Sequence, residues 1–205
     1  MLKDLFRNLT DIIFVNLLWL LVSFLGLLIT LGAATTAMFR VTFQILKKNE
    51  PTNVLSSFFK SFKEGFILST LVWFALLAIG FPLFFMYHYA ISNDLIVLLL
   101  ISIVGGYQLL IFTIYFFPVA AIFKTDHWKD LIKNVTLMAN TNLWTNFKVI
   151  GSLAFLVLVI VFIHESLILI AVGLYGVLVS FHLKKVFTPY LIKLGELDLD
   201  NGRNE

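Results

Sequence analysis

Four titratable side chains lie in or near the short polar turns of this sequence and are the first candidates for chemistry. They are His88, Asp94, His164 and Glu165. Two imidazoles and a carboxylate can bind zinc. The sequence has no spaced motif such as His-Glu-x-x-His, which would set two imidazoles on one helix face. We therefore interpret these residues as polar helix ends at a water interface, and we predict no catalytic residue, no cofactor and no metal.

Arg40 is the next candidate, because it is the first charge after Asp11 and follows about 28 uncharged residues. A charge inside a membrane marks a functional site by default, although a long side chain can also reach the headgroups as an anchor. Asn16 can hydrogen-bond a neighbouring helix within a bundle. The residues that we single out as candidates for structural or functional importance are Asn16, Trp19, Gly32, Ala33, Ala34, Thr35, Thr36 and Arg40.

The composition identifies the class of protein. Of 205 residues, 60% are hydrophobic and 13% are charged, against about 25% charged residues in soluble domains. The uncharged runs exceed the roughly 20 residues that cross a bilayer as a helix, so we predict an all-α, polytopic helical membrane protein. Lysines flank these runs and form no basic stripe, so no nucleic-acid partner is expected. The chain has no cysteine, which excludes disulfides and thiol chemistry.

Five to six transmembrane or re-entrant helices are expected to position the candidate residues. Apolar runs predict spans over about 11–29, 65–93 and 95–123, and a helical hairpin over 149–181 that turns at 164–166. Breaks are expected at 30–32, at Gly105-Gly106, and at Pro118 and Pro189. Amphipathic patterns near 53–64 and 126–139 predict two cytoplasmic helices in the membrane interface. Residues 1–194 are predicted to form one helical membrane domain, and 195–205 a flexible acidic cytoplasmic tail.

The segment 33–48 fits two placements. As a helix, its 16 residues cover roughly 24 Å, slightly less than the hydrocarbon core. It either returns across the membrane, which gives six segments and a cytoplasmic N-terminus, or lies flat with Arg40 at the headgroups, which gives five crossings. Lysines and arginines number five over 40–64, four over 124–148 and four after 183, and none lies in the turns 91–94 and 164–165. The positive-inside rule therefore places the C-terminus in the cytoplasm and favours six segments.

Several stretches carry a resemblance to a known family. They are Asn16-Leu-Leu-Trp19-Leu-Leu, Leu31-Gly32-Ala33-Ala34-Thr35-Thr36-Ala37, Ser57-Phe58-Phe59-Lys60-Ser61-Phe62-Lys63 and Tyr115–Phe123. With them the sequence resembles the YesL-like family of bacterial membrane proteins, a domain of unknown function. Where members of that family often have a proline, this chain has Leu25-Gly26. The resemblance implies no catalytic or binding residues, because none are established for the family.

The resemblance also implies a role near carbohydrate uptake, since family members often accompany genes for carbohydrate ABC transport. We expect a non-enzymatic accessory or regulatory partner of a carbohydrate (ABC-type) transport system, located in the bacterial cell membrane. Its expected partners are the lipid bilayer and transporter subunits, which would dock on the amphipathic helices near 53–64 and 126–139. The alternative is a small solute transporter or channel, which would need polar residues along a path through the bundle.

Overall fold

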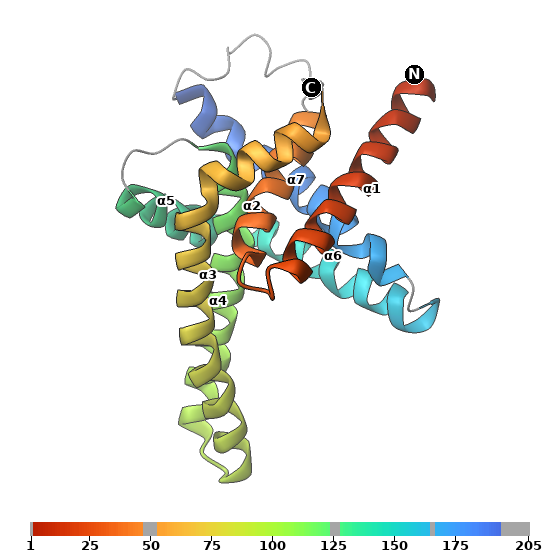
Figure 1. Ribbon diagram of the computed structural model, residues 1–205. Helices are drawn as coiled ribbons and strands as arrows, with labels where there is room; N and C mark the ends of the chain where they lie inside the picture. The colour runs from red at the N-terminus through yellow and green to blue at the C-terminus, as the bar shows by residue number, and fades with distance from the viewer. Residues whose placement is uncertain (1, 47–52, 124–127, 165–166, 194–205) are drawn as a thin grey trace.

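The computed structural model describes residues 2–46, 53–123, 128–164 and 167–193. Within them run seven α-helices: α1 (Leu2–Leu25), α2 (Leu31–Leu46), α3 (Val54–Ser92), α4 (Ile96–Ile122), α5 (Trp128–Thr141), α6 (Leu143–Phe162) and α7 (Ile168–Lys193). Figure 1 shows their arrangement. The predicted tail over 195–205 lies outside the described residues.

Five of the helices are long and apolar enough to cross a membrane. The segments are Arg7–Leu25, Val54–Ser92, Ile96–Ile122, Leu143–Phe162 and Ile170–Ile192. Their outer faces carry large exposed apolar side chains, among them Phe24 and Phe162, each 81% exposed. A soluble protein rarely exposes contiguous apolar surface on this scale. The predicted class, a helical protein compatible with a membrane, is therefore confirmed.

The first break in the chain lies earlier than the sequence predicts. A turn over 26–30 separates α1 from α2, and Leu27 and Leu28 adopt positive φ angles of 50° and 63° there. Gly26 permits the turn, because a Cβ at this position would overlap the side chain of Thr30. The Thr30 hydroxyl closes it by donating to the Val22 carbonyl at 2.8 Å. The prediction of a break at 30–32 was thus wrong for Gly32, which lies inside α2.

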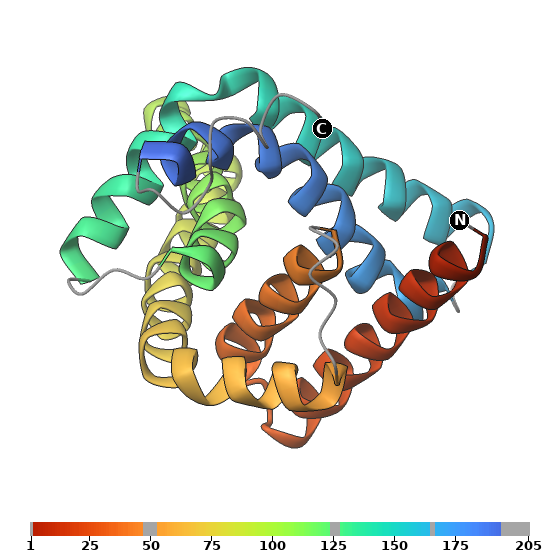
Figure 2. The same cartoon turned by 90° about the horizontal axis from the view of Figure 1, so that it is seen from above.

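Helix α2 occupies the interior of the bundle. None of its 16 residues is exposed, and 11 are buried. It packs against α1, α3, α4 and α7, which surround it when the molecule is seen from above (Figure 2). A helix that lies flat on a membrane keeps one face in the headgroups. The burial of α2 on all sides instead makes it a core element of the bundle.

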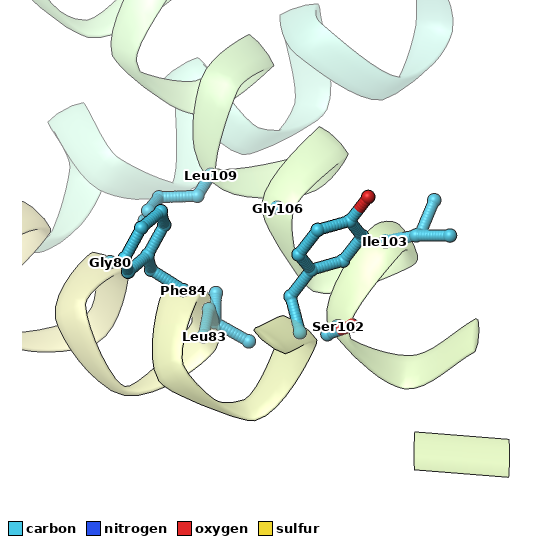
Figure 3. A pocket seen from close by; sticks show the side chains of 8 residues that line it. Gly80, Leu83, Phe84, Ser102, Ile103, Gly106 and Leu109 are labelled. Atoms are coloured by element: carbon cyan, nitrogen blue, oxygen red, sulfur yellow. The ribbon is translucent and has the colours of Figure 1, made fainter. Parts of the chain in front are cut away.

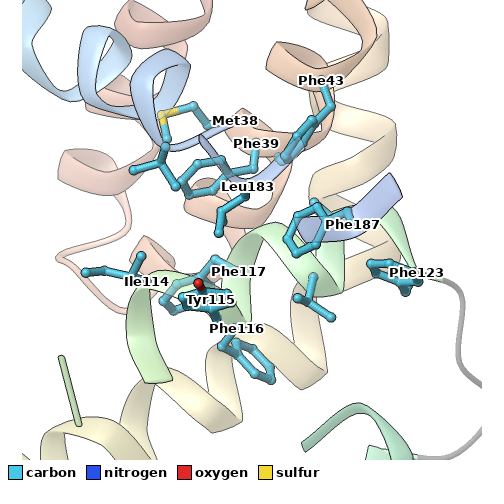
Figure 4. Packing of buried hydrophobic residues seen from close by; sticks show 14 of the residues in the cluster. Met38, Phe39, Phe43, Ile114, Tyr115, Phe116, Phe117, Phe123, Leu183 and Phe187 are labelled. Atoms are coloured by element: carbon cyan, nitrogen blue, oxygen red, sulfur yellow. The ribbon is translucent and has the colours of Figure 1, made fainter. Parts of the chain in front are cut away.

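The main apolar core forms where α2, α4 and α7 meet (Figure 4). Phe187 of α7 lies between Phe43 of α2 and Phe123 at the end of α4, with ring centroids 5.9 Å and 5.6 Å apart. Such tilted and edge-to-face pairs are favoured by the ring quadrupole. Tyr115 and Phe116 of α4 are fully buried beside them. These contacts hold α4 and α7 against α2.

Helices α3 and α4 form a long hairpin that projects beyond the other helices (Figure 1). The 39 residues of α3 run from a cap, in which Asn53 accepts from the Ser56 amide, through Pro82 to Ser92. The stretch near 53–64 is therefore the first part of this helix, not a separate surface helix. Its Phe58 is fully buried while Phe59 is 38% exposed, so only some of the aromatic side chains in this stretch point outward.

Three further expected breaks do not occur. Helix α4 is continuous through Gly105, Gly106 and Pro118, and α7 continues through Pro189. A proline removes one backbone hydrogen bond, and neighbouring helices in a bundle can compensate for that loss. Here Pro118 is buried, and Phe187 and Leu191 in the last turns of α7 belong to the apolar core. Packing thus overrides the local preference.

The remaining helices pack on the outside of this core. Helix α5 turns Leu131, Val135 and Met138 into the bundle and packs on α4. Helices α6 and α7 contact each other.

Helices α2 and α3 approach each other closely at Gly32. A Cβ at Gly32 would overlap the backbone carbonyl oxygen of Ser69 and lie 2.8 Å from the Trp73 Cβ. Backbone atoms cannot move aside as the end of a flexible side chain can. Gly32 is therefore required by packing, in the way that small residues let membrane helices approach one another.

Replacing this glycine tests the approach. We expect Gly32→Ala to lower the midpoint of thermal unfolding in detergent, because α2 and α3 must separate to admit the methyl group. Overpacking of this kind costs about 1–3 kcal/mol, which corresponds to a shift of roughly 2–12 °C for a chain of this size.

The matched control is Gly106→Ala in α4, where an added Cβ would meet nothing within 4 Å. This variant should unfold at or slightly above the temperature of the parent protein, because alanine favours a helix over glycine. Equal midpoints for the two variants would contradict the close contact at Gly32.

Candidate functional site

The polar side chains of α2 that meet α3 form one continuous line, which we call the polar seam. It consists of Thr36, Arg40 and Gln44 on α2 and Ser69, Glu64 and Ser57 on α3. The three α2 residues are four positions apart, so they lie on one helix face. Their partners on α3 follow in the reverse order because the two helices run antiparallel. The seam is the main concentration of polar contacts between helices in the described part of the chain.

The centre of the seam is an ion pair. Arg40 donates to Glu64 with an Nη1–Oε2 distance of 2.7 Å, and the two side chains are 28% and 45% exposed. Arginine and carboxylate make strong, charge-assisted hydrogen bonds. Sequence analysis left Arg40 as either an intramembrane charge or a headgroup anchor. The structure gives it a protein partner on the next helix.

On one side of the ion pair the seam is made of hydroxyls and is buried. The Thr36 and Ser69 oxygens are 2.8 Å apart, and both residues are buried. On the other side, the Ser57 hydroxyl donates to the Gln44 amide oxygen at 2.7 Å. Each of the three α2 residues in the seam thus has a hydrogen-bond partner on α3. Paired polar groups of this kind hold helices together where water is scarce.

A second set of contacts joins α1 to the bundle. The Trp19 indole donates to the Thr35 hydroxyl at 3.0 Å, and that hydroxyl donates to the Leu31 carbonyl. Asn16 is 1% exposed and accepts from the backbone amide of Gly173 in α7 at 2.7 Å. A Cβ on Gly173 would lie 2.7 Å from the Cβ of Asn16. Asn16 thus joins two helices that are far apart in the sequence.

The candidates from the sequence therefore all fall within one assembly. Ala33 and Ala34 are fully buried between the helices, Gly32 meets Ser69, and the polar candidates make the contacts described above. Chemically, this arrangement pairs charges and hydroxyls and leaves no nucleophile activated by a base. The assembly positions helices.

Sequence reasoning missed the α3 side of the seam. Glu64 received no role, although it is the only carboxylate between Glu50 and Asp94, as Arg40 is the only cation between Arg7 and Lys47. Two such isolated opposite charges on adjacent predicted helices are a usable signal. Ser57 and Ser69 carried no comparable signal, since serines are frequent in this chain.

The histidines and carboxylates considered for zinc do not assemble. Among the described residues, no three His, Asp or Glu side chains lie close enough to share a metal ion. His88 packs its ring against Phe84, with centroids 4.4 Å apart. Glu165 lies outside the described residues.

A cavity of about 300 Å³ opens between α3 and α4 in the projecting hairpin (Figure 3). It is lined by Gly80, Leu83, Phe84, Tyr87, Ser102, Ile103, Gly106 and Leu109. Its polar groups are two hydroxyls, and that of Ser102 already donates to the Leu99 carbonyl at 2.8 Å. Glycines at 80 and 106 create the space. The lining suits an apolar chain and contains no acid–base pair.

Charge reversal tests the ion pair. Arg40→Glu and Glu64→Arg should each lower the thermal midpoint in detergent, because each places two like charges at the seam. The double variant should recover much of the loss, with a coupling of about 0.5–3 kcal/mol as expected for residues in contact. If the two losses simply add in the double variant, the residues do not interact.

Comparison with known proteins covers the region of the seam. Residues 12–87 match the family model described as "Protein of unknown function, DUF624". That range begins in α1 and includes all of α2 and most of α3, so it contains every residue of the polar seam. Neither the curated proteins nor the solved structures contain a match to this chain. The match supports a relation of this part of the chain to an uncharacterised domain family.

Proposed function

We propose that the protein is a multi-pass membrane protein whose bundle has six helical segments, α2 included, with both ends of the chain in the cytoplasm. The start of α1, the end of α2, the start of α3 and the end of α7 lie toward the same end of the molecule, while the α1–α2 and α3–α4 turns lie lower (Figure 1). In the sequence, lysine and arginine lie close to these helix ends, as Lys3 and Arg7 do in α1, Lys60 and Lys63 in α3, and Lys184 and Lys185 in α7. The positive-inside rule makes that end cytoplasmic.

Cysteine labelling tests this topology cleanly, because the native chain has no cysteine. A Lys3→Cys variant should resist a membrane-impermeant thiol reagent in intact cells and react after permeabilisation. An Asn93→Cys variant, in the exposed α3–α4 turn, should react in both conditions. Labelling of Lys3→Cys in intact cells would replace the six-segment topology with five crossings.

For the activity, we propose a non-enzymatic accessory or regulatory partner of a transport system. The observation that carries this proposal is the outward face of α5. Leu137 is 52% exposed there beside Lys133, while Leu131, Val135 and Met138 on the opposite face are buried. Trp128, the first residue of the helix, is 58% exposed although it lies on the same side as the buried residues. An exposed leucine beside lysines, with an exposed tryptophan at the start of the same helix, suits a surface that meets another macromolecule at the membrane boundary.

The polar seam supports an accessory role over a solute path. A transporter needs polar groups that line a route through the bundle. In this protein Thr35, Thr36, Arg40 and Gln44 of α2 are paired with α1 or α3, so these polar groups serve packing between helices. The carbohydrate ABC-type system rests on the resemblance to the YesL-like family, whose members often accompany such genes.

Site-specific crosslinking tests the partner. A photo-crosslinking amino acid at Leu137 should capture a subunit of an ABC transporter in the native membrane, identified by mass spectrometry. The same probe at Phe155, which is 63% exposed on α6, should capture lipid. This control reports on exposure to the membrane alone.

Two outcomes would count against an accessory role. Crosslinks from Leu137 to lipid alone would leave α5 as a membrane anchor. Sugar uptake by vesicles that contain only this protein, compared with empty vesicles, would establish the alternative of a small transporter.

A further inference from the structure

A group of basic side chains gathers where the first turns of α6 meet the second half of α7. Lys148 and Ser152 lie one turn apart on α6, and His182 and Lys185 lie one turn apart on α7. The Ser152 oxygen is 3.3 Å from Nε2 of His182, which ties the two helices together at this level. We call these four residues the basic corner.

The hydrogen-bond directions in the basic corner follow from proton counting. The Ser152 hydroxyl has one proton and donates it to the Lys148 carbonyl at 2.8 Å. Its contact with His182 therefore needs the imidazole Nε2–H as the donor. This contact fixes the orientation of the ring across the helix interface.

The corner has no compensating negative charge from its own helices. Lys148 lies one turn from Ser152 on α6 and Lys185 lies one turn from His182 on α7, so both charges flank the Ser152–His182 contact. The described residues of α6 and α7 include no aspartate or glutamate. Neither Lys148 nor Lys185 forms an ion pair with a carboxylate in the part of the chain that the structure describes. A cluster of this kind attracts an anion.

The aromatic residues place the corner at the membrane surface. Trp144 and Phe147 are each 69% exposed and stack with centroids 5.8 Å apart. The Lys148 ammonium lies 5.5 Å from the Trp144 ring centroid, within range of a cation–π interaction. Exposed tryptophan with lysine is typical of the headgroup level, and α6 beyond Ser152 is uninterrupted apolar sequence.

We propose that the basic corner binds the phosphate of an anionic phospholipid, with the ammonium groups of Lys148 and Lys185 as its charge partners and the oriented His182 between them. The acyl chains of that lipid would lie along the exposed apolar face of α6, where Phe155 and Leu158 are 63% and 54% exposed. The proposal concerns a lipid and does not depend on a transporter partner.

Lipid binding to the purified full-length protein tests the proposal. The probes are phosphatidylglycerol and phosphatidylcholine, and the readout is the amount of each lipid retained in native mass spectrometry. The parent protein should prefer phosphatidylglycerol. In the double variant Lys148→Gln/Lys185→Gln, the ratio of retained phosphatidylglycerol to phosphatidylcholine should fall about ten- to thirty-fold, as expected for the loss of two lysines near anionic headgroups.

The matched control is Lys129→Gln/Lys133→Gln on α5. It removes the same charge, and Lys129 also lies over a tryptophan, at 5.7 Å from the Trp128 centroid. This variant should keep the preference for phosphatidylglycerol within about two-fold. Lys129 and Lys133 lie on a single helix, without basic groups from a second helix beside them, and exposed charges of this kind contribute little. All four lysines are exposed, so both variants are expected to fold.

Three outcomes would overturn the proposal. The first is an equal preference of the parent protein for both lipids, a result that needs no variant. The second is an equal loss in the control variant, which would indicate a general effect of net charge. The third is displacement of phosphatidylglycerol by millimolar inorganic phosphate, which would assign the corner to a free anion.

Discussion

The structure depends on the contact between α2 and α3 at Gly32. A short helix can occupy the centre of a bundle only if its neighbours come close, and here the backbone of α3 takes the place of a side chain on α2. In a membrane, helices gain little from the hydrophobic effect when they associate, so close packing and polar contacts provide the attraction. Helices α1, α4 and α7 then pack on the remaining faces of α2.

The polar contacts between α2 and α3 change in character along the polar seam. Along α2 it passes from a hydroxyl pair at Thr36 to an ion pair at Arg40 and an amide–hydroxyl pair at Gln44. Its most polar members thus lie toward the end of α2, where the helix approaches the charged connections of the chain. A charge is costly at the centre of a bilayer and much less so near its surface. The order of the pairs fits a helix that enters the membrane from that end.

Polar groups in the interior of the molecule differ in their contacts from those on its rim, by which we mean the exposed surface of α5 and of the basic corner. In the interior, the polar seam joins α2 to α3, and Asn16 joins α1 to α7. On the rim, α5 and the basic corner expose lysines and aromatic rings to whatever surrounds the protein. The contacts that we propose with a lipid and with a partner therefore lie on the rim, while the region matched by the family model contributes packing between helices.

The sequence by itself determined the class of protein and most of the long helices, because long uncharged runs are visible without a structure. The tertiary structure decided where α2 lies, since a helix of 16 residues fits both a surface and an interior by length. It also decided that Pro118 and Pro189 do not end their helices, because packing from other helices outweighs one lost hydrogen bond. The partner of Arg40 was likewise decided by the fold, since Glu64 is 24 residues away and only antiparallel packing of α2 on α3 brings the two charges together.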